Sequence, residues 1–179
     1  MNEKVLIVVD MQNDFVDAAL GTKEAVQIVP EVVRAIQDPS YDMVIATLDT
    51  HHENYLSTLE GRYLPVEHCI ENTEGWQFNP LVEDALAARG AMILKKPTFG
   101  SRTLAEMLQE MQPAQVDYCG LCTDICVLSN ALMVRAALPD TEMRVLAKAC
   151  AGTTPEKHDA AIAVLGSCQI PVKEDTDHE

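Results

Sequence analysis

Cys126 lies in segment 120–127, where an apolar run passes into a helical pattern. Such a turn favours a reactive thiol, because the first N–H groups of a helix are unpaired and its positive dipole end lowers a thiol pKa. The same N–H groups can hold an oxyanion. Cys126 is therefore the first candidate for a nucleophile, although burial as an inert core residue is the commoner fate of a free cysteine.

Two residues elsewhere in the chain have the chemistry that a thiol nucleophile needs. A thiol with a pKa near 8.5 is only a few per cent ionised at neutral pH, so it requires a base or a positive field. Asp10 follows the first apolar run and would accept the proton. Lys96 follows the third run and would pair with that carboxylate and favour the thiolate. Lys95 is the alternative, since either lysine could point inward.

Carboxylate and imidazole groups gather in segment 49–68. Asp49 and His51 place two side chains on one side of an extended turn. Glu60 and His68, later in the segment, could complete a mixed nitrogen and oxygen site. Such a set with open positions suits Zn, Mn or Fe. The alternative is that the two histidines form only local hydrogen bonds.

Apolar runs that predict strands alternate along the chain with amphipathic segments that predict helices. This alternation indicates an α/β fold with a parallel sheet covered on both faces. In such a sheet the active site lies beyond the carboxyl ends of the strands, where the candidate residues fall. The predicted strands are 5–9, 43–48, 91–94, 116–120 and 143–147, all buried, and the predicted helices are 28–36, 81–88, 104–111, 125–137 and 155–165.

Composition limits the class of protein. With 179 residues, of which 47% are hydrophobic, we expect one domain over 1–179 with a polar tail at 173–179. A net charge of −15 argues against binding to nucleic acid or to an anionic membrane. The apolar run 5–9 is too short for a signal or membrane-spanning segment, so we expect a cytoplasmic protein. Its six cysteines are expected to be reduced, and the Cys119 and Cys122 spacing lacks the second pair of a zinc site.

Four motifs resemble those of the isochorismatase-like cysteine hydrolases and, within them, the nicotinamidases. The resemblance runs over nearly the whole chain and implies a doubly wound α/β fold with a central parallel sheet. The motifs are Asp-Met-Gln-Asn-Asp-Phe at 10–15, Asp-Thr-His at 49–51, Lys-Pro at 96–97 and Gly-Leu-Cys-Thr-Asp-Ile-Cys-Val at 120–127.

The resemblance implies a catalytic triad of Asp10, Lys96 and Cys126. The thiolate would attack an amide carbonyl, Asp10 would pass the proton to the leaving ammonia, and water would then hydrolyse the thioester. The oxyanion would lie against the N–H groups of Cys126 and Cys122. Because relatives carry a non-proline cis bond in this turn, Leu121–Cys122 is the expected position for one.

The nicotinamidase pattern also implies a metal site and a ring-binding pocket. One divalent ion would be held by the candidate residues of segment 49–68 and would receive the pyridine nitrogen of the substrate. Phe15 matches a family position that contacts the ring, and Phe99 is a second candidate to line the pocket. Trp76 is expected to serve packing, and His158 to be structural or interfacial.

These features favour a metal-assisted cysteine amidohydrolase that converts nicotinamide to nicotinate and ammonia, in pyridine nucleotide salvage. The segment between His51 and Trp76 is compact, so another small amide or carbamoyl compound is an alternative substrate. A second alternative is a metal-free hydrolase of a carbamoyl group or a vinyl ether. A third is a noncatalytic subunit that binds a small metabolite or serves assembly. Family analogy also predicts a homo-oligomer.

Overall fold

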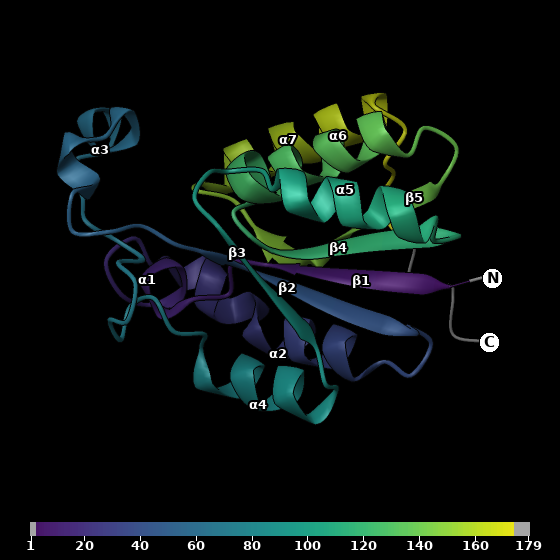
Figure 1. The fold of residues 1–179 in the computed structure, drawn as a ribbon, viewed down its shortest axis with the longest axis horizontal. Coiled ribbons are helices and arrows are strands. Elements are labelled where there is room, and N and C mark those ends of the chain that lie inside the picture. Colours follow the sequence, from purple (N-terminus) through teal and green to yellow (C-terminus); the bar gives the residue numbers. More distant parts are fainter. Residues whose placement is uncertain (1–2, 174–179) are drawn as a thin grey trace.

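A five-stranded parallel sheet forms the centre of the computed structural model, which describes residues 3–173 (Figure 1). The strand order is β3-β2-β1-β4-β5, and every neighbouring pair is parallel. The predicted α/β fold is therefore confirmed. The strands are β1 (Lys4–Val9), β2 (Met43–Asp49), β3 (Met92–Lys96), β4 (Gln115–Leu121) and β5 (Glu142–Ala151).

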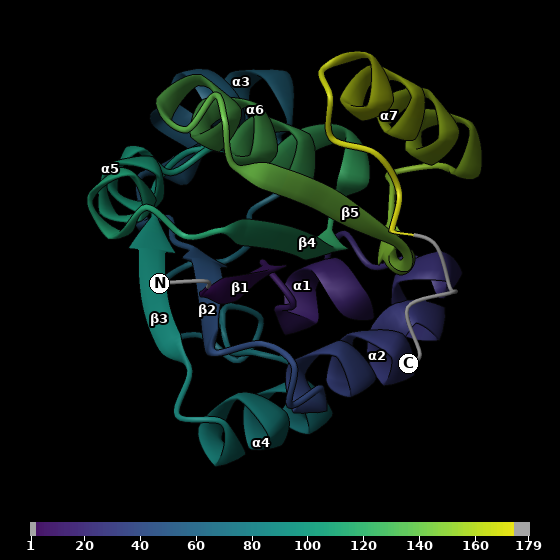
Figure 2. The ribbon, with the colours of Figure 1, turned by 90° about the vertical axis from the view of Figure 1, so that its right-hand side faces the viewer.

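Helices cover both faces of this sheet, as predicted. Viewed from the amino ends of the strands, α2 (Lys23–Gln37) and α4 (Pro80–Ala88) lie on one face (Figure 2). The opposite face is covered by α5 (Arg102–Met111), α6 (Leu128–Ala137) and α7 (Pro155–Ser167).

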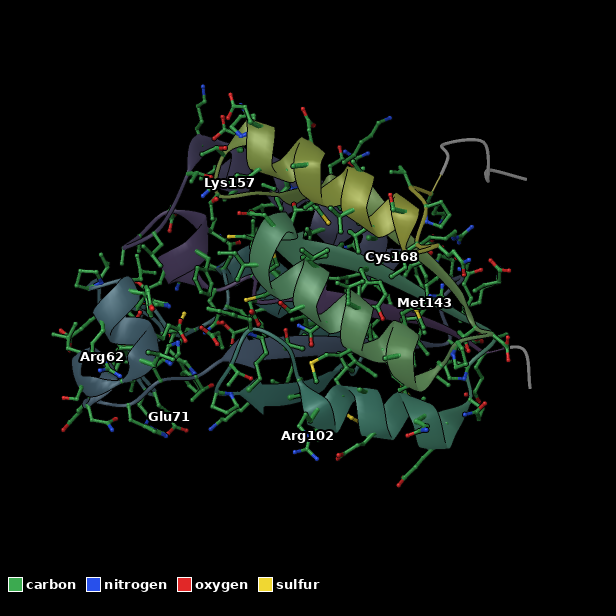
Figure 3. All side chains as sticks on the ribbon, turned by 90° about the horizontal axis from the view of Figure 1, so that it is seen from above. Arg62, Glu71, Arg102, Met143, Lys157 and Cys168 are labelled. Carbon is green, nitrogen blue, oxygen red and sulfur yellow. The ribbon has the colours of Figure 1, made fainter. Side chains whose placement is uncertain are left out.

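Short helical segments lie beyond the carboxyl edge of the sheet. They are α1 (Asn13–Val16), η1 (Tyr55–Ser57) and α3 (Leu59–Tyr63). Seen from above, the part of the molecule that carries Arg62 and Glu71 lies at the end of the sheet, away from the layer of α5, α6 and α7 (Figure 3). The edge where the active site was predicted is thus walled by these segments.

The centre of the sheet is dry because β1 is apolar on both of its faces. Every residue from Val5 to Val9 is fully buried between the two helix layers. Helix α2 contributes an apolar stripe from one side and begins at Lys23, five residues before the prediction. The reason is Thr22, whose side chain accepts a hydrogen bond from the N–H of Ala25 and so caps the helix one residue before Lys23.

The prediction that all five strands are buried is wrong for β3. Met92 and Ile93 are each 42% exposed, because β3 is the edge strand and pairs only with β2 among the described strands. Strand β5, at the other edge, runs four residues beyond the prediction. After an irregularity it pairs with β4 again, at Cys150 and Ala151.

The remaining predictions at this level concern cysteines, membranes and the tail. All six cysteines are free in the structure, and their reduced state stays a prediction. No helix in the described part of the chain is long and apolar enough to cross a membrane. The predicted polar tail lies outside the described residues except for Lys173.

Candidate active site

Asp10, Lys96 and Cys126 meet at the carboxyl edge of the sheet. Asp10 follows β1, Lys96 is the last residue of β3, and Cys126 lies in η2 (Thr123–Val127), a π-helical turn after β4. The Nζ atom of Lys96 is 2.6 Å from Oδ2 of Asp10 and 3.5 Å from Sγ of Cys126. Their exposed fractions are 0%, 1% and 5% for Asp10, Lys96 and Cys126, so this charged cluster is shielded from water.

Lys96, and not Lys95, is the lysine that points inward. Because successive side chains of a strand point to opposite faces, only one of the two can reach the cluster. Lys95 is exposed, pairs with Glu71 at 2.6 Å and lies over the ring of Trp76. The register also places Lys96 opposite Asp49 of β2, and its ammonium donates to Oδ1 of that residue at 3.2 Å.

Burial and neighbouring charges set the protonation of this cluster. Burial raises the pKa of the Cys126 thiol well above its ordinary value, the charge of Asp10 adds to this, and Lys96 opposes it. Burial also raises the pKa of Asp10, although Lys96 opposes that shift. For Lys96, burial alone would lower the pKa, but Asp10, Cys126 and Asp49 outweigh it and raise the pKa. The resting cluster therefore pairs a neutral thiol with an ammonium.

The two oxygens of the Asp10 carboxylate have different surroundings. Oδ1 accepts a hydrogen bond from the hydroxyl of Thr47 at 2.7 Å. Oδ2 forms the ion pair with Lys96, and within the described residues this buried atom accepts no hydrogen bond of regular geometry. Oδ2 is therefore the oxygen left to receive a proton.

The turn that carries Cys126 has a special backbone. The peptide bond between Leu121 and Cys122 is cis, at the position that the resemblance implied. Gly120, just before it, has a φ of 111°, and a Cβ atom there would lie 2.1 Å from the carbonyl oxygen of Val9. Only glycine fits this close approach of β4 to β1.

Side chains from neighbouring helices hold the turn in place. The amide of Asn130 donates to the carbonyl oxygen of Cys126 at 2.8 Å and to that of Phe99 at 3.1 Å. Nδ1 of His158 lies 2.8 Å from the hydroxyl of Thr123, so the contact of His158 is structural. These contacts tie the turn to the α5 side of the site and to α7.

Asp49, His51 and His68 form a buried cluster that could hold a metal ion. One ligand atom from each lies within 4.8 Å of the others. Oδ2 of Asp49 is 3.0 Å from Nε2 of His51 and 3.8 Å from Nε2 of His68. Glu60 faces the same point, because its Oε1 lies 3.6 and 3.7 Å from the two Nε2 atoms. The two oxygens of Asp49 thus face two sites, Oδ1 the ammonium of Lys96 and Oδ2 the histidines.

The surroundings of this cluster fit a metal ion. Nδ1 of His68 lies 2.8 Å from the carbonyl oxygen of Val66, which fixes the ring and leaves Nε2 facing the cluster. Burial alone would lower the pKa of His51, but its hydrogen bond to Asp49 and the charge of that residue outweigh burial and raise the pKa. A bound cation would take the place of that proton. Two imidazoles with one or two carboxylates suit Zn, Mn or Fe.

Gln12 connects the segment of Asp49 and His51 to the loop that carries Trp76. Its fully buried amide accepts from the N–H of Asp49 at 2.8 Å and donates to the carbonyl oxygens of Asp49 and Trp76 at 2.9 and 2.8 Å. The amide therefore fixes the end of β2 against the loop that leads to α4. Asp14, two residues later, accepts from the N–H of Cys69, beside His68.

The aromatic candidates take different positions. Phe15 is 8% exposed, and its ring lies 5.4 Å from the ring of His68, so it borders the metal candidates. Phe99 is 46% exposed. Trp76 donates from Nε1 to the hydroxyl of Thr50 at 3.0 Å, in keeping with the packing role predicted for it. Whether Phe15 or Phe99 contacts a substrate stays a prediction.

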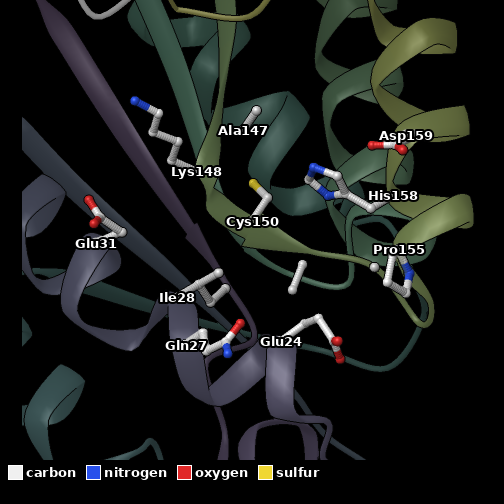
Figure 4. A pocket seen from close by; sticks show the side chains of 12 residues that line it. Glu24, Gln27, Ile28, Glu31, Ala147, Lys148, Cys150, Pro155, His158 and Asp159 are labelled. Carbon is white, nitrogen blue, oxygen red and sulfur yellow. The ribbon is translucent and has the colours of Figure 1, made fainter.

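A pocket of about 410 Å³ lies between α2, β5 and α7 (Figure 4). Its lining includes Glu24, Glu31, Cys150 and His158, but none of the residues of the charged cluster or of the metal candidates. It is therefore separate from the site at the carboxyl edge, although His158 links its wall to the turn that carries Cys126.

Reasoning from the sequence missed three supporting residues, Gln12, Thr47 and Asn130. Each is fully buried and hydrogen-bonds a candidate site residue. Gln12 stands inside the first motif, which was a usable signal. Thr47 and Asn130 are polar residues inside apolar segments, a weaker signal that names no partner.

Known proteins resemble this chain over nearly its whole length. A family model described as the isochorismatase domain matches residues 4–174. The nicotinamidase of Schizosaccharomyces pombe is 27% identical over 208 residues, which cover 96% of this chain and 93% of that protein. The crystal structure of nicotinamidase/pyrazinamidase PncA from Bacillus subtilis has a TM-score of 0.85 at 27% identity, over 96% of this chain and 100% of that one. The pyrazinamidase of Pyrococcus horikoshii in complex with zinc has a TM-score of 0.78 at 30% identity, over 96% and 99%.

Proposed function

The chain belongs to the isochorismatase family, and we propose that within it the protein is a metal-assisted cysteine amidohydrolase, a nicotinamidase. The observation that carries the proposal is one carboxylate shared by two sites. Asp49 offers Oδ1 to Lys96, beside Cys126, and Oδ2 to the cluster with His51 and His68. A ring held at the cluster would place its carboxamide beside the thiol.

In the proposed reaction Asp10 moves one proton. Oδ2 of Asp10 accepts the proton of the Cys126 thiol, and the thiolate attacks the carbonyl carbon of the amide. The C–N bond then breaks as Asp10 passes that proton to the departing ammonia, which leaves a thioester on Cys126. Water adds to the thioester, Asp10 takes its proton, and the proton returns to sulfur as the C–S bond breaks.

The other residues of the cluster would stabilise charge. Lys96 stays protonated throughout the reaction. The negative charge moves between the carboxylate of Asp10 and the sulfur of Cys126, and the ammonium stabilises it at both positions. The tetrahedral oxyanion would lie against the N–H groups of Cys126 and Cys122, a contribution of roughly 3 kcal/mol for each donor. The raised pKa of Asp10 suits a base that must return its proton.

A divalent ion, when bound by Asp49, His51 and His68, would supply a Lewis acid that anchors the pyridine nitrogen. We include Glu60 as a fourth ligand and Phe15 and Phe99 as walls of the ring pocket. The zinc in the pyrazinamidase of Pyrococcus horikoshii supports a metal in this family. The ligand set itself leaves Zn, Mn and Fe open.

Ammonia release from nicotinamide tests the proposal. The purified protein is assayed as isolated, after chelation, and after return of Zn, Mn or Fe, with Cys126→Ala as the blank. We expect release that depends on both Cys126 and the metal. Benzamide, which lacks the ring nitrogen, should react much more slowly than nicotinamide. No release from folded, metal-loaded protein would refute the nicotinamidase proposal.

Two experimental outcomes would support the alternative functions instead. Turnover that persists in His51→Asn would support a metal-free hydrolase of a carbamoyl compound or a vinyl ether. Absence of turnover on every small amide, with Cys126 inert to alkylation, would support a noncatalytic subunit. Assembly as a homo-oligomer stays a prediction that sedimentation can test.

A further inference from the structure

The hydroxyl of Thr47 lies against the Asp10 carboxylate at the carboxyl edge of the sheet. Thr47 is a fully buried residue of β2, and its Oγ1 donates to Oδ1 of Asp10 at 2.7 Å. The main chains of the two residues also meet, because the N–H of Asp10 donates to the carbonyl oxygen of Thr47 at 3.3 Å. Asp10 has a φ of 48°, in the left-handed region, where an aspartate needs local support.

Two donors from different strands each contact one oxygen of the Asp10 carboxylate. Thr47 of β2 holds Oδ1, and Lys96 of β3 lies 2.6 Å from Oδ2. Contacts at both oxygens fix the rotation of the carboxylate about its Cβ–Cγ bond. Without the hydroxyl, the ion pair with Lys96 would be the main contact left among the described residues to orient the group, and that ammonium also contacts Asp49 and Cys126.

We propose that Thr47 is a positioning residue that holds Asp10 with Oδ2 toward the Cys126 thiol. The inference rests on the proposed function, in which Asp10 is the base. A misplaced base loses much of the roughly 100- to 10,000-fold that a positioned acid or base contributes to rate. The hydroxyl also donates to the ionised form of Asp10, so its loss makes that carboxylate bind a proton more tightly.

The test compares Thr47→Val, which keeps the shape and removes the donor, with Thr47→Ser, which keeps the donor. With nicotinamide as substrate, Thr47→Val should lower kcat about tenfold with KM within about twofold of wild type. Thr47→Ser should restore most of the lost rate. The acid limb of the pH profile should move up by roughly one unit in Thr47→Val alone.

Alkylation of Cys126 by iodoacetamide gives a readout that does not need turnover. The rate is followed by mass spectrometry from pH 4 to 9, with the half-buried Cys168 as the internal reference. The acid limb of the Cys126 alkylation profile should shift to higher pH in Thr47→Val and not in Thr47→Ser. If wild type fails to hydrolyse nicotinamide but the alkylation profile of Thr47→Val shows this shift, the proposed function fails and the role of Thr47 stands.

Two results would overturn the inference. One is a Thr47→Val protein with wild-type kcat and an unshifted alkylation profile. The other is a Thr47→Ser protein as impaired as Thr47→Val, which would show that packing and not the hydroxyl matters. If Thr47→Val does not fold, Thr47→Ala takes its place in the same comparison with Thr47→Ser.

Discussion

Replacing Lys96 by methionine removes the cation from a buried cluster while keeping the apolar stem of the side chain. Lys96 and Asp10 are both fully buried in their side chains and lie 2.6 Å apart. Loss of one partner of a buried pair costs about 3–5 kcal/mol, because the other charge stays buried without compensation. With an m-value of about 2 kcal/mol per M, a loss of about 4 kcal/mol lowers the urea midpoint by about 2 M.

The assay is urea unfolding with a chelator present, so that metal binding does not contribute. The neighbouring Lys95→Met is the matched control, because its ion pair with Glu71 is exposed and screened by solvent and should contribute little to stability. Lys96→Met combined with Asp10→Asn removes both charges and should recover part of the loss.

The sign of the pH dependence follows from the carboxylate that is left behind. Burial raises the pKa of Asp10, and removing Lys96, which opposes that shift, raises it further. When the pKa of a carboxyl group is higher in the folded than in the unfolded protein, the free energy of unfolding falls as the pH rises from the unfolded-state pKa to the folded-state pKa. The deficit of Lys96→Met should therefore grow between pH 4 and pH 7. A urea midpoint for Lys96→Met within about 0.3 M of that for Lys95→Met at neutral pH would refute this reasoning.

Three further predictions concern the base, the metal and the turn. The kcat/KM profile on nicotinamide should fall on the acid side with a midpoint above about 4, because burial raises the pKa of Asp10 and only the ionised form accepts a proton; a midpoint at or below about 4 contradicts this. In chelator competition, Glu60→Gln should weaken zinc binding roughly tenfold and His68→Asn at least about a hundredfold, since His68 is buried and fixed while Glu60 is half-buried; equal losses would remove that distinction. Gly120→Ala should cost more than about 3 kcal/mol in urea unfolding, because its Cβ would lie 2.1 Å from a carbonyl oxygen of β1, whereas Gly166→Ala meets no atom within 4 Å and should change stability by less than about 1 kcal/mol.

The location of the site could be predicted, because the carboxyl ends of parallel strands meet at one edge of the sheet. Asp10, Asp49 and Lys96 each stand at the end of an apolar run, and the register then brings Asp49 opposite Lys96. Side chains alternate along β3, so which of the two lysines points inward follows once one residue of the strand is known to face the core. The strand pattern does not identify that residue, so the motif resemblance, and not the alternation, was what favoured Lys96 over Lys95.

Contacts that bridge distant segments could not be predicted. The hydrogen bond from Thr47 to Asp10 spans 37 positions, and that from Asn130 to Phe99 spans 31. A polar residue in an apolar run signals a buried partner but does not name it. The exposure of Ile93 was missed for a related reason, because composition does not tell an edge strand from a central one.

The exposed edge strand has a consequence for how activity would fail. Lys96 depends on β3, which is five residues long and pairs only with β2 among the described strands, whereas Asp10 follows β1, in which Val5–Val9 are fully buried. Edge strands open in local fluctuations that leave the rest of a fold intact. Each opening of β3 would withdraw the ammonium from the thiol, so heat should abolish turnover before the sheet melts. Amide protons of β3 should likewise exchange with solvent faster than those of β1.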